Sequence, residues 1–92
     1  MKAYTINEEN HGFIGVAASH KAALQWLVTL GWVDQYSEIW CLDESKRWGG
    51  YNKMLGALYG ENWKEEFLQF SKDQLENMGF YIREEELIGE EN

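Results

Sequence analysis

Alternating hydrophobic and polar positions at the start of the chain predict a β-hairpin. Residues 2–7 and 13–17 are rich in β-branched and aromatic side chains, and the polar run 7–12 separates them. Gly12 supplies the backbone freedom needed where the chain leaves the turn, and Gly15 indicates a bulge or a close approach by another element. The sequence therefore predicts two paired strands before the first helix.

The next hydrophobic pattern has the period of an amphipathic helix. Ser19 can cap its start, because the hydroxyl accepts hydrogen bonds from the first free backbone N–H groups. Apolar residues then follow at the i, i+3, i+4, i+7 spacing of a buried stripe, namely Ala23, Trp26, Leu27 and Leu30. Gly31 stands where a left-handed residue ends a helix, and Trp32 is placed to fold back on the last turn.

The middle of the chain predicts a strand and then a helix. Residues 38–42 are rich in β-formers and lie between polar segments, so we expect a third strand there. Helical spacing resumes with Trp48, Tyr51, Leu55 and Leu58. Because a glycine in a helix interior costs roughly 1 kcal/mol, Gly49 and Gly50 indicate that this helix begins at or after Gly50. Gly60 ends it.

Two short helices and a last strand are predicted in the C-terminal third. The first helix, capped by Asn62, has an aromatic stripe that consists of Trp63, Phe67 and Phe70. Ser71 and Gln74 form a capping-box pattern for the second helix, and Gly79 closes it. Residues 80–82 then predict a strand that runs into an acidic cluster.

These elements combine into an α+β fold of the order ββαβααβ. A sheet of about four strands, antiparallel or mixed, with helices packed on one face would bury the apolar stripes. With 45% hydrophobic and 15% aromatic residues, the 92 residues are enough for a single domain with its own core, and the tail 89–92 is expected to fray. This composition excludes a disordered or collagen-like chain.

Cysteine content and hydropathy restrict the expected cellular setting. The single cysteine, Cys41, cannot form an internal disulfide, which fits a reducing cytoplasm. Nothing in the chain resembles a secretion signal, and the longest apolar stretches are only a few residues. We therefore expect a cytoplasmic protein without a membrane span.

The net charge of −8 is distributed unevenly along the chain. Residues 1–60 contain six acids and five bases, whereas residues 61–92 contain ten acids and three bases, so the two parts carry −1 and −7. A negative field repels nucleic-acid phosphates and attracts basic surfaces, so a basic partner is favoured over DNA or RNA. The negative charge could also serve solubility alone, with no specific partner, and this alternative stays open.

No pattern of residues indicates a catalytic or metal site. Cys41 with His11 or His20 and a nearby acid would supply a nucleophile and a base, but its apolar neighbours favour an inert, protonated thiol. The two histidines have no zinc-binding spacing, and Glu84 to Glu86 lack the converging ligands of a tight calcium or magnesium site. We therefore predict no catalytic residues, no metal and no cofactor.

Aromatic residues are the stronger candidates for a binding role. The chain contains five tryptophans, and a domain of this size has difficulty burying all of them with its other aromatics. We expect most of them in the core and one or two aromatics partly exposed near glycines, the best candidates being Trp48, Tyr51, Tyr59 and Trp63. Such residues anchor protein interfaces. Lys46 and Arg47 stand beside Trp48, but two basic residues are too few to bind single-stranded nucleic acid. They are expected to form local ion pairs or to belong to a site that recognises a protein.

Several short segments give the chain a family likeness. They are Glu-Asn-His-Gly-Phe-Ile-Gly-Val in the hairpin, a helix closing on Gly-Trp, Gly-Glu-Asn-Trp-Lys-Glu-Glu-Phe, and Phe-Tyr-Ile-Arg-Glu-Glu-Glu-Leu. Through them the chain resembles small proteins encoded by phages and integrated elements of Gram-positive bacteria. The resemblance implies an accessory mobile-element protein. Some small acidic proteins of that kind are anti-CRISPR or antirestriction inhibitors, which block nucleic-acid-binding surfaces of host defence enzymes, and this step is an analogy.

The leading hypothesis is a non-enzymatic acidic binding protein that inhibits a host nucleic-acid-handling defence system by occupying its basic surface. Acidic side chains would take positions that phosphates otherwise occupy, with aromatic anchors beside them. The predicted partner-binding residues are Glu65, Glu66, Asp73, Glu76, Glu84, Glu85, Glu86, Trp48, Tyr51 and Trp63. The alternative is a structural or regulatory interaction module that acts as a homodimer through a strand edge or an aromatic patch.

Overall fold

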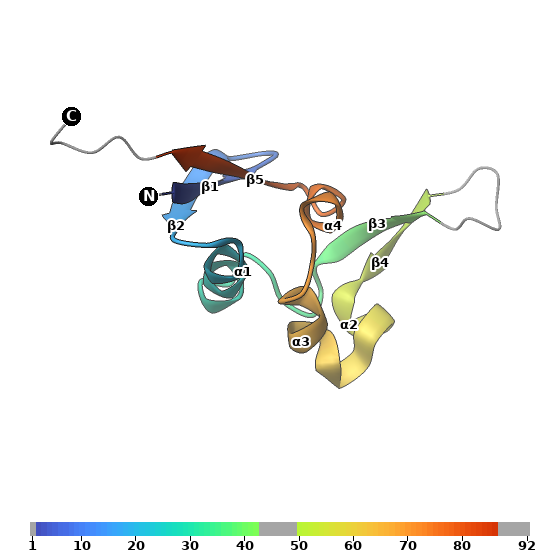
Figure 1. Cartoon of the computed structure of the whole chain (residues 1–92). Helices are drawn as coiled ribbons and strands as arrows, with labels where there is room; N and C mark the ends of the chain where they lie inside the picture. The colour runs from blue at the N-terminus through green and yellow to red at the C-terminus, as the bar shows by residue number, and fades with distance from the viewer. Residues whose placement is uncertain (1, 43–49, 87–92) are drawn as a thin grey trace, which may run out of the picture.

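The computed structural model describes the backbone of residues 2–42 and 50–86 and the side chains of residues 2–40 and 52–86. Figure 1 shows two β-sheets with short helices below and between them. The strands are β1 (Lys2–Glu8), β2 (Gly12–Ala17), β3 (Glu38–Leu42), β4 (Gly50–Met54) and β5 (Phe80–Glu86). The helical elements are α1 (His20–Thr29), α2 (Leu55–Tyr59), the 3-10 turn η1 (Gly60–Asn62), α3 (Trp63–Phe67) and α4 (Lys72–Glu76).

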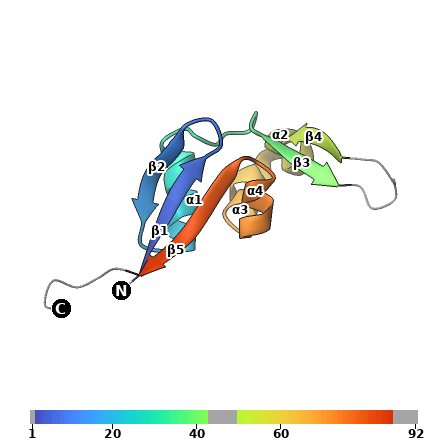
Figure 2. The ribbon, with the colours of Figure 1, turned by 90° about the horizontal axis from the view of Figure 1, so that it is seen from above.

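β1 is the central strand of a three-stranded antiparallel sheet in the order β2-β1-β5. The register places Ile6 opposite Gly15 on β2 and opposite Ile82 on β5, and both isoleucines are buried. Figure 1 and Figure 2 show α1 lying along one face of this sheet. The predicted hairpin is confirmed, and the last strand pairs with the first.

The close approach of α1 to β2 depends on Gly15. A Cβ atom at this position would lie 2.9 Å from Cη2 and from Cζ2 of Trp26, so a larger residue would displace the indole. The register of β1 and β2 also shifts between Ile6 and Asn7, whose partners are Gly15 and Phe13. The close approach predicted for Gly15 is therefore confirmed, and the irregularity of the ladder lies next to it, at Ile14.

α1 begins and ends where the sequence predicts. The Ser19 hydroxyl accepts a hydrogen bond from the backbone N–H of Ala22 at 3.0 Å, and Gly31 has a φ of 80° after the helix. Leu27 is fully buried, as expected from the stripe. Leu30 differs, because it is the C-cap residue, where the chain leaves the helix, and it is 59% exposed.

β3 and β4 form a separate two-stranded antiparallel sheet. The backbone N–H of Trp40 donates to the carbonyl oxygen of Asn77 at 2.9 Å, which joins β3 to the end of α4. The backbone N–H of Leu55 donates to the carbonyl oxygen of Ser37 at 2.8 Å, which joins the start of α2 to the segment before β3. α4 lies between the two sheets in both views (Figure 1, Figure 2).

One cluster of buried side chains connects the helices with both sheets. Its members are Ile6, Ala23, Leu24, Leu27, Val33, Ile39, Leu55, Phe67, Phe70, Leu75, Phe80 and Ile82. The rings of Phe67 and Phe70 lie 5.3 Å apart between centroids, so the aromatic stripe predicted after Asn62 does enter the core. Trp63, the first residue of that stripe, is only partly buried against it.

Two of the three predicted N-caps are confirmed, Ser19 at the start of α1 and Ser71 at the start of α4. Ser71 accepts from the backbone N–H of Gln74, and its own backbone N–H donates to Oε1 of Gln74 at 2.9 Å, which completes the capping box of α4. Asn62 was wrong as a cap, because its side chain forms no capping hydrogen bond and its backbone continues from the 3-10 turn into α3. A 3-10 turn that leads into a helix already occupies some of the groups that a cap would bind.

The chain has an α+β fold, as predicted, but the order ββαβααβ and the single sheet of about four strands are not what the structure shows. The described residues form five strands in two sheets. The additional strand is β4, where helical spacing predicted the start of a helix. Gly50–Met54 instead pairs with Glu38–Leu42 along its whole length, because ladder hydrogen bonds outweigh a weak helical preference beside glycine. The helix begins only at Leu55.

In the described part of the chain, none of the helices combines the length and apolar character needed to cross a membrane. The tail 89–92, which was expected to fray, lies outside the described residues.

Candidate partner-binding surface

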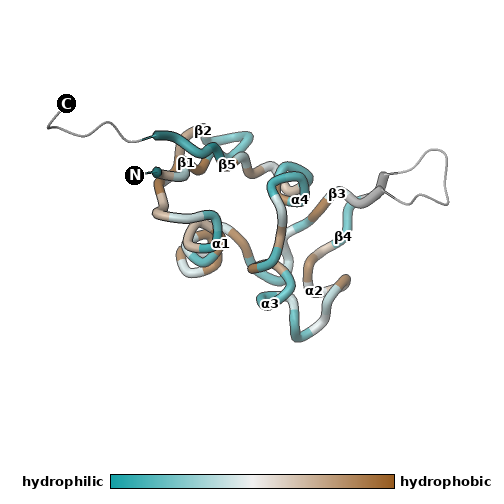
Figure 3. The backbone as a smooth tube through the Cα atoms, in the orientation of Figure 1, coloured by the Kyte–Doolittle hydropathy of each residue, from teal (hydrophilic) through white to brown (hydrophobic). Residues whose placement is uncertain are grey.

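Four of the predicted acidic residues lie on the short helices α3 and α4. They are Glu65, Glu66, Asp73 and Glu76, and all four side chains are exposed. Figure 3 shows hydrophilic positions on both helices and along β5. Lys64 lies on the same helix as the first two acids, with its Nζ 5.7 Å from the centroid of the Trp63 ring. These helices therefore present a mainly acidic surface.

The three predicted acids of β5 do not share one face. Side chains of a strand alternate, so Glu84 and Glu86 point to one side of the sheet and Glu85 to the other. Glu84 is engaged within the chain, because Tyr4 Oη donates to its Oε1 at 2.9 Å and Lys2 Nζ lies 3.1 Å from its Oε2. The hydrogen bond from Tyr4, followed by the contact with Lys2, lowers the pKa of Glu84 below its ordinary value.

The predicted aromatic anchors are distributed differently from expectation. Trp48 lies outside the described residues, and Tyr51 belongs to β4 by its backbone, with its side chain outside the description. Trp63 is half-buried and lines a groove of about 570 Å³ together with Tyr36 and Met54, both of which are exposed. We expected most tryptophans in the core, but the buried cluster of the described residues contains none.

Trp40 is the tryptophan with the largest exposed surface in the described part of the chain. Its side chain is 43% exposed, whereas its neighbour Ile39 on the same strand is buried. The alternation of β3 explains this difference, because successive side chains point to opposite faces.

Trp40 borders a cleft between the two sheets that has a volume of about 670 Å³, which we call the inter-sheet cleft. Its acidic lining consists of Glu8 at the end of β1, Glu9 in the following turn, Glu38 at the start of β3 and Glu76 at the end of α4. None of the described residues that line this cleft is basic. The cleft thus joins three acids from the nearly neutral N-terminal part with one from the acidic C-terminal part.

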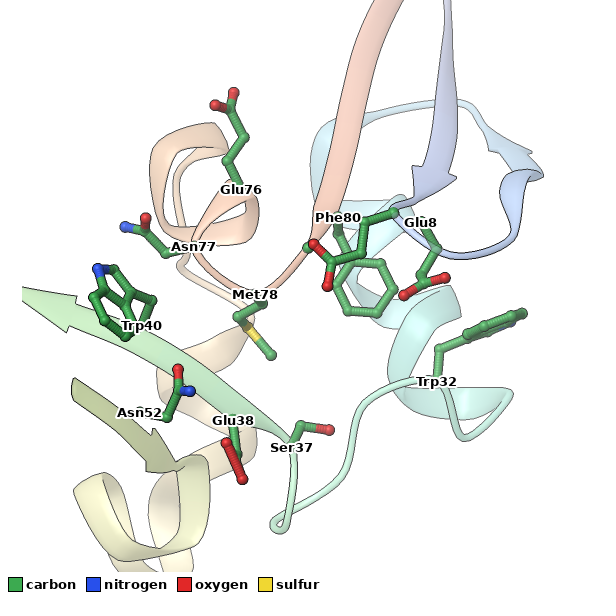
Figure 4. A pocket seen from close by; sticks show the side chains of 12 residues that line it. Glu8, Trp32, Ser37, Glu38, Trp40, Asn52, Glu76, Asn77, Met78 and Phe80 are labelled. Carbon is green, nitrogen blue, oxygen red and sulfur yellow. The ribbon is translucent and has the colours of Figure 1, made fainter. Parts of the chain in front are cut away.

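Apolar side chains form the rest of the cleft wall. Figure 4 shows Trp40 and Trp32 on opposite sides, with Met78 and Phe80 between them. Phe80 is buried and belongs to the core cluster, and Met78 packs against that cluster. The inter-sheet cleft therefore has an apolar, aromatic surface next to carboxylates.

Glu8 is held in place by its own turn. Its Oε1 accepts from the backbone N–H of Asn10 at 2.8 Å and from Nδ1 of His11 at 2.6 Å. The hydrogen bond with His11 lowers the pKa of Glu8 below its ordinary value. The His11 ring in turn stands edge-on to Trp32, with 5.2 Å between ring centroids. This chain of contacts fixes one end of the cleft.

Glu9 is positioned by the turn that precedes β5. Its backbone N–H donates to the carbonyl oxygen of Gly79 at 2.9 Å. Gly79 has a φ of 91°, and a Cβ atom there would lie 2.8 Å from Cδ of Glu9. The positive φ favours glycine in this turn, and a larger residue there would also displace the Glu9 side chain.

The two histidines considered for nucleophilic chemistry each form a hydrogen bond within the described part of the chain. Nε2 of His20 donates to the carbonyl oxygen of Phe70 at 2.8 Å, and His11 is bonded to Glu8. The side chain of Cys41 lies outside the description, as do Lys46 and Arg47. Among the described residues, no three His, Cys, Asp or Glu side chains are close enough together to hold a metal ion.

Sequence reasoning identified Glu76 and missed the other members of the inter-sheet cleft. Glu8, Glu9 and Glu38 were overlooked because charge was summed along the chain, where they lie far from the acidic third. Two local signals were available. Glu8 and Glu9 directly follow the first predicted strand, and the side chains of Ile39 and Trp40 must point to opposite faces of theirs. Neither signal reveals that the turn before β5 brings these segments together.

Comparisons with protein-family models, with curated proteins and with solved structures found no match.

Proposed function

We propose that the protein is a non-enzymatic, acidic inhibitor of phage or mobile-element origin, similar to anti-CRISPR proteins, that acts in the host cytoplasm. It would occupy a basic, nucleic-acid-binding surface of a host defence protein. The observation that best supports this proposal is the inter-sheet cleft. There, acids from both parts of the chain adjoin the exposed Trp40, and no basic residue of the described chain lines the cleft.

The physical basis of the proposal is the chemistry of interfaces with basic proteins. Exposed carboxylates on α3 and α4 offer acceptors where a nucleic acid would offer phosphates. Such an interface forms rapidly and weakens as ionic strength rises, because salt screens exposed charges. An exposed tryptophan adds an apolar contact of the kind that dominates binding energy at interfaces.

The test is affinity capture from lysates of Gram-positive host cells with the tagged protein, eluted by a salt gradient and read by mass spectrometry. We expect a stoichiometric basic protein that elutes as salt rises and that nucleic acid displaces from the column. The matched variant Glu65→Lys/Glu66→Lys should retain less of it. Capture of no protein, or of one that nucleic acid does not displace, would contradict the proposal.

The strand β2 supports the alternative of a homodimer. In the described part of the chain β2 pairs with β1 alone, so its other edge carries backbone groups without a strand partner. Its sequence Gly-Phe-Ile-Gly-Val-Ala contains no charged residue, and Phe13 and Val16 are 63% and 53% exposed. Edges of this kind pair with other strands unless charges prevent it.

Light scattering after size exclusion tests this alternative. A homodimer through β2 would be detected as twice the monomer mass, and Val16→Lys would convert it to monomer by placing a charge beside the paired edge. A monomer at all concentrations would rule out the homodimer. A dimer that Val16→Lys leaves intact would show that β2 is not the interface.

A further inference from the structure

We infer that the inter-sheet cleft is the binding site for an arginine side chain that the basic partner presents on an extended segment. This inference rests on the proposed function and names the contact through which the partner would be recognised. The cleft is open to solvent and about 670 Å³ in volume, within the range of ligand sites. An open cleft suits a side chain delivered by a protein better than a small molecule, which needs most of its surface enclosed.

The aromatic walls favour a planar cation. Trp32 and Trp40 stand on opposite sides of the cleft, and Trp40 presents an exposed indole (Figure 4). A guanidinium group stacks on an indole face through cation–π attraction, which is strongest for tryptophan. The aliphatic part of the same side chain would lie against Met78, since long charged residues cover apolar surface with their stems.

The carboxylates supply the acceptors that the guanidinium needs. Glu9, Glu38 and Glu76 are exposed, and none of these three side chains forms a hydrogen bond or ion pair with any described residue. Glu8 differs, because His11 and the turn backbone already engage its Oε1. Glu9, Glu38 and Glu76 are therefore the three cleft carboxylates that we assign to the incoming cation.

Arginine fits this combination better than lysine. Its guanidinium is flat, has five N–H donors in a fixed fork and is weakly hydrated, so it can stack on an indole and donate to carboxylates at once. An ammonium group is compact and strongly hydrated and cannot do both in the same way. The structure thus predicts a preference for arginine over lysine at this cleft.

The first experiment is an NMR titration of the 15N-labelled protein with three capped pentapeptides, in which glycines flank one arginine, one lysine or one citrulline. Citrulline has the shape of arginine without its charge. We expect the indole N–H signals of Trp32 and Trp40 to shift with the arginine peptide, to shift less with lysine and to stay in place with citrulline. Unmoved indole signals at millimolar arginine peptide, or equal responses to arginine and citrulline, would overturn the inference.

Variants locate the effect within the protein. Glu38→Gln/Glu76→Gln should weaken binding of the arginine peptide at least about tenfold, because charge-assisted hydrogen bonds are lost. The matched control Glu65→Gln/Glu66→Gln removes the same charge away from the cleft and should leave the peptide affinity within about twofold. Equal losses in both variants would show that net charge, and not the cleft, determines binding.

Trp40→Leu keeps an apolar side chain on β3 but removes the indole, and it should reduce the preference for arginine over lysine. Because Trp40 is exposed, we expect this variant to fold. The dispersion of its NMR spectrum is the check on folding. A folded Trp40→Leu protein with unchanged peptide preference would contradict the stacking arrangement.

Capture of the partner with the native protein and with the cleft variant distinguishes failure of this inference from failure of the proposed function. If Glu38→Gln/Glu76→Gln retains the partner as well as the native protein does, the cleft is not the recognition site, while inhibition of a basic surface still stands. If the arginine peptide binds the cleft but no basic nucleic-acid-handling protein is captured, the proposed function fails and the arginine site remains.

Discussion

Replacing Gly15 with alanine tests how closely α1 packs on the three-stranded sheet. The added methyl group would lie 2.9 Å from two ring atoms of Trp26, well inside van der Waals contact, so the indole must move. Overpacking of this kind costs about 1–3 kcal/mol. Restricting the unfolded chain at a former glycine offsets about 0.4–1 kcal/mol of that cost. We therefore expect Gly15→Ala to lower the free energy of unfolding by about 1–2 kcal/mol.

The assay is urea unfolding followed by tryptophan fluorescence, supported by thermal melts. For a domain of this size the expected loss corresponds to a Tm lower by roughly 5–15 °C. The control Val16→Ala truncates an exposed side chain of the same strand and should change stability by no more than about 0.5 kcal/mol.

A double-mutant cycle with Trp26→Leu identifies the cause. Leucine lacks the ring atoms that the new methyl group would meet, so Gly15→Ala should be nearly neutral in the Trp26→Leu background, with a coupling energy of about 1 kcal/mol or more. Equal destabilisation in both backgrounds, or no destabilisation in the native background, would refute the packing described here.

Three further predictions follow from the core, the caps and the β1–β5 ladder. Phe67→Ala should lower the free energy of unfolding by about 3–5 kcal/mol, because this ring is completely buried, and urea unfolding measures the loss. Ser71→Ala should cost about 1 kcal/mol in thermal melts, whereas Asn62→Ala should cost less than about 0.5 kcal/mol, since only Ser71 forms a capping hydrogen bond. Tyr4→Phe should raise the pKa of Glu84 toward its ordinary value in an NMR titration, because the hydroxyl no longer stabilises the carboxylate; an unchanged pKa would show that Tyr4 is not its partner.

The same pKa shift gives the pH dependence of the Tyr4–Glu84 contact a definite sign. Folding lowers the pKa of Glu84, so the stability that the contact contributes is present at neutral pH and is lost as pH falls through the lowered, folded-state pKa. Because the group is exposed, the effect on total stability is small. The difference between the native protein and Tyr4→Phe in chemical denaturation should therefore disappear at acidic pH.

Local sequence signals predicted the elements that depend on local interactions. The caps at Ser19 and Ser71 and the strand Glu38–Leu42 match the structure, because capping hydrogen bonds and short runs of strand-forming residues are encoded within a few positions. β4 was missed, because each of its residues pairs with a residue of β3 that lies 8 to 16 positions earlier in the chain. The helical spacing of Tyr51, Leu55 and Leu58, taken alone, favours a helix that includes this segment.

The candidate site was less predictable than the fold. Summing charge along the sequence found the acidic helices but assigned Glu84 to a partner surface, whereas Tyr4 and Lys2 at the other end of the chain engage it. The inter-sheet cleft forms where the turn before β5 meets the β1–β2 turn, through the contact of Glu9 with Gly79. A contact between residues seventy positions apart leaves no periodic pattern in the sequence.

We propose that acidic and aromatic side chains of this protein take the place of nucleic acid on a basic partner. The most direct measurement is the affinity of the captured partner for its own nucleic acid, by fluorescence anisotropy, at increasing concentrations of this protein. We expect pure competition, in which the apparent Kd for the nucleic acid rises with protein concentration and no ternary complex forms. A ternary complex with an unchanged Kd for the nucleic acid would contradict it.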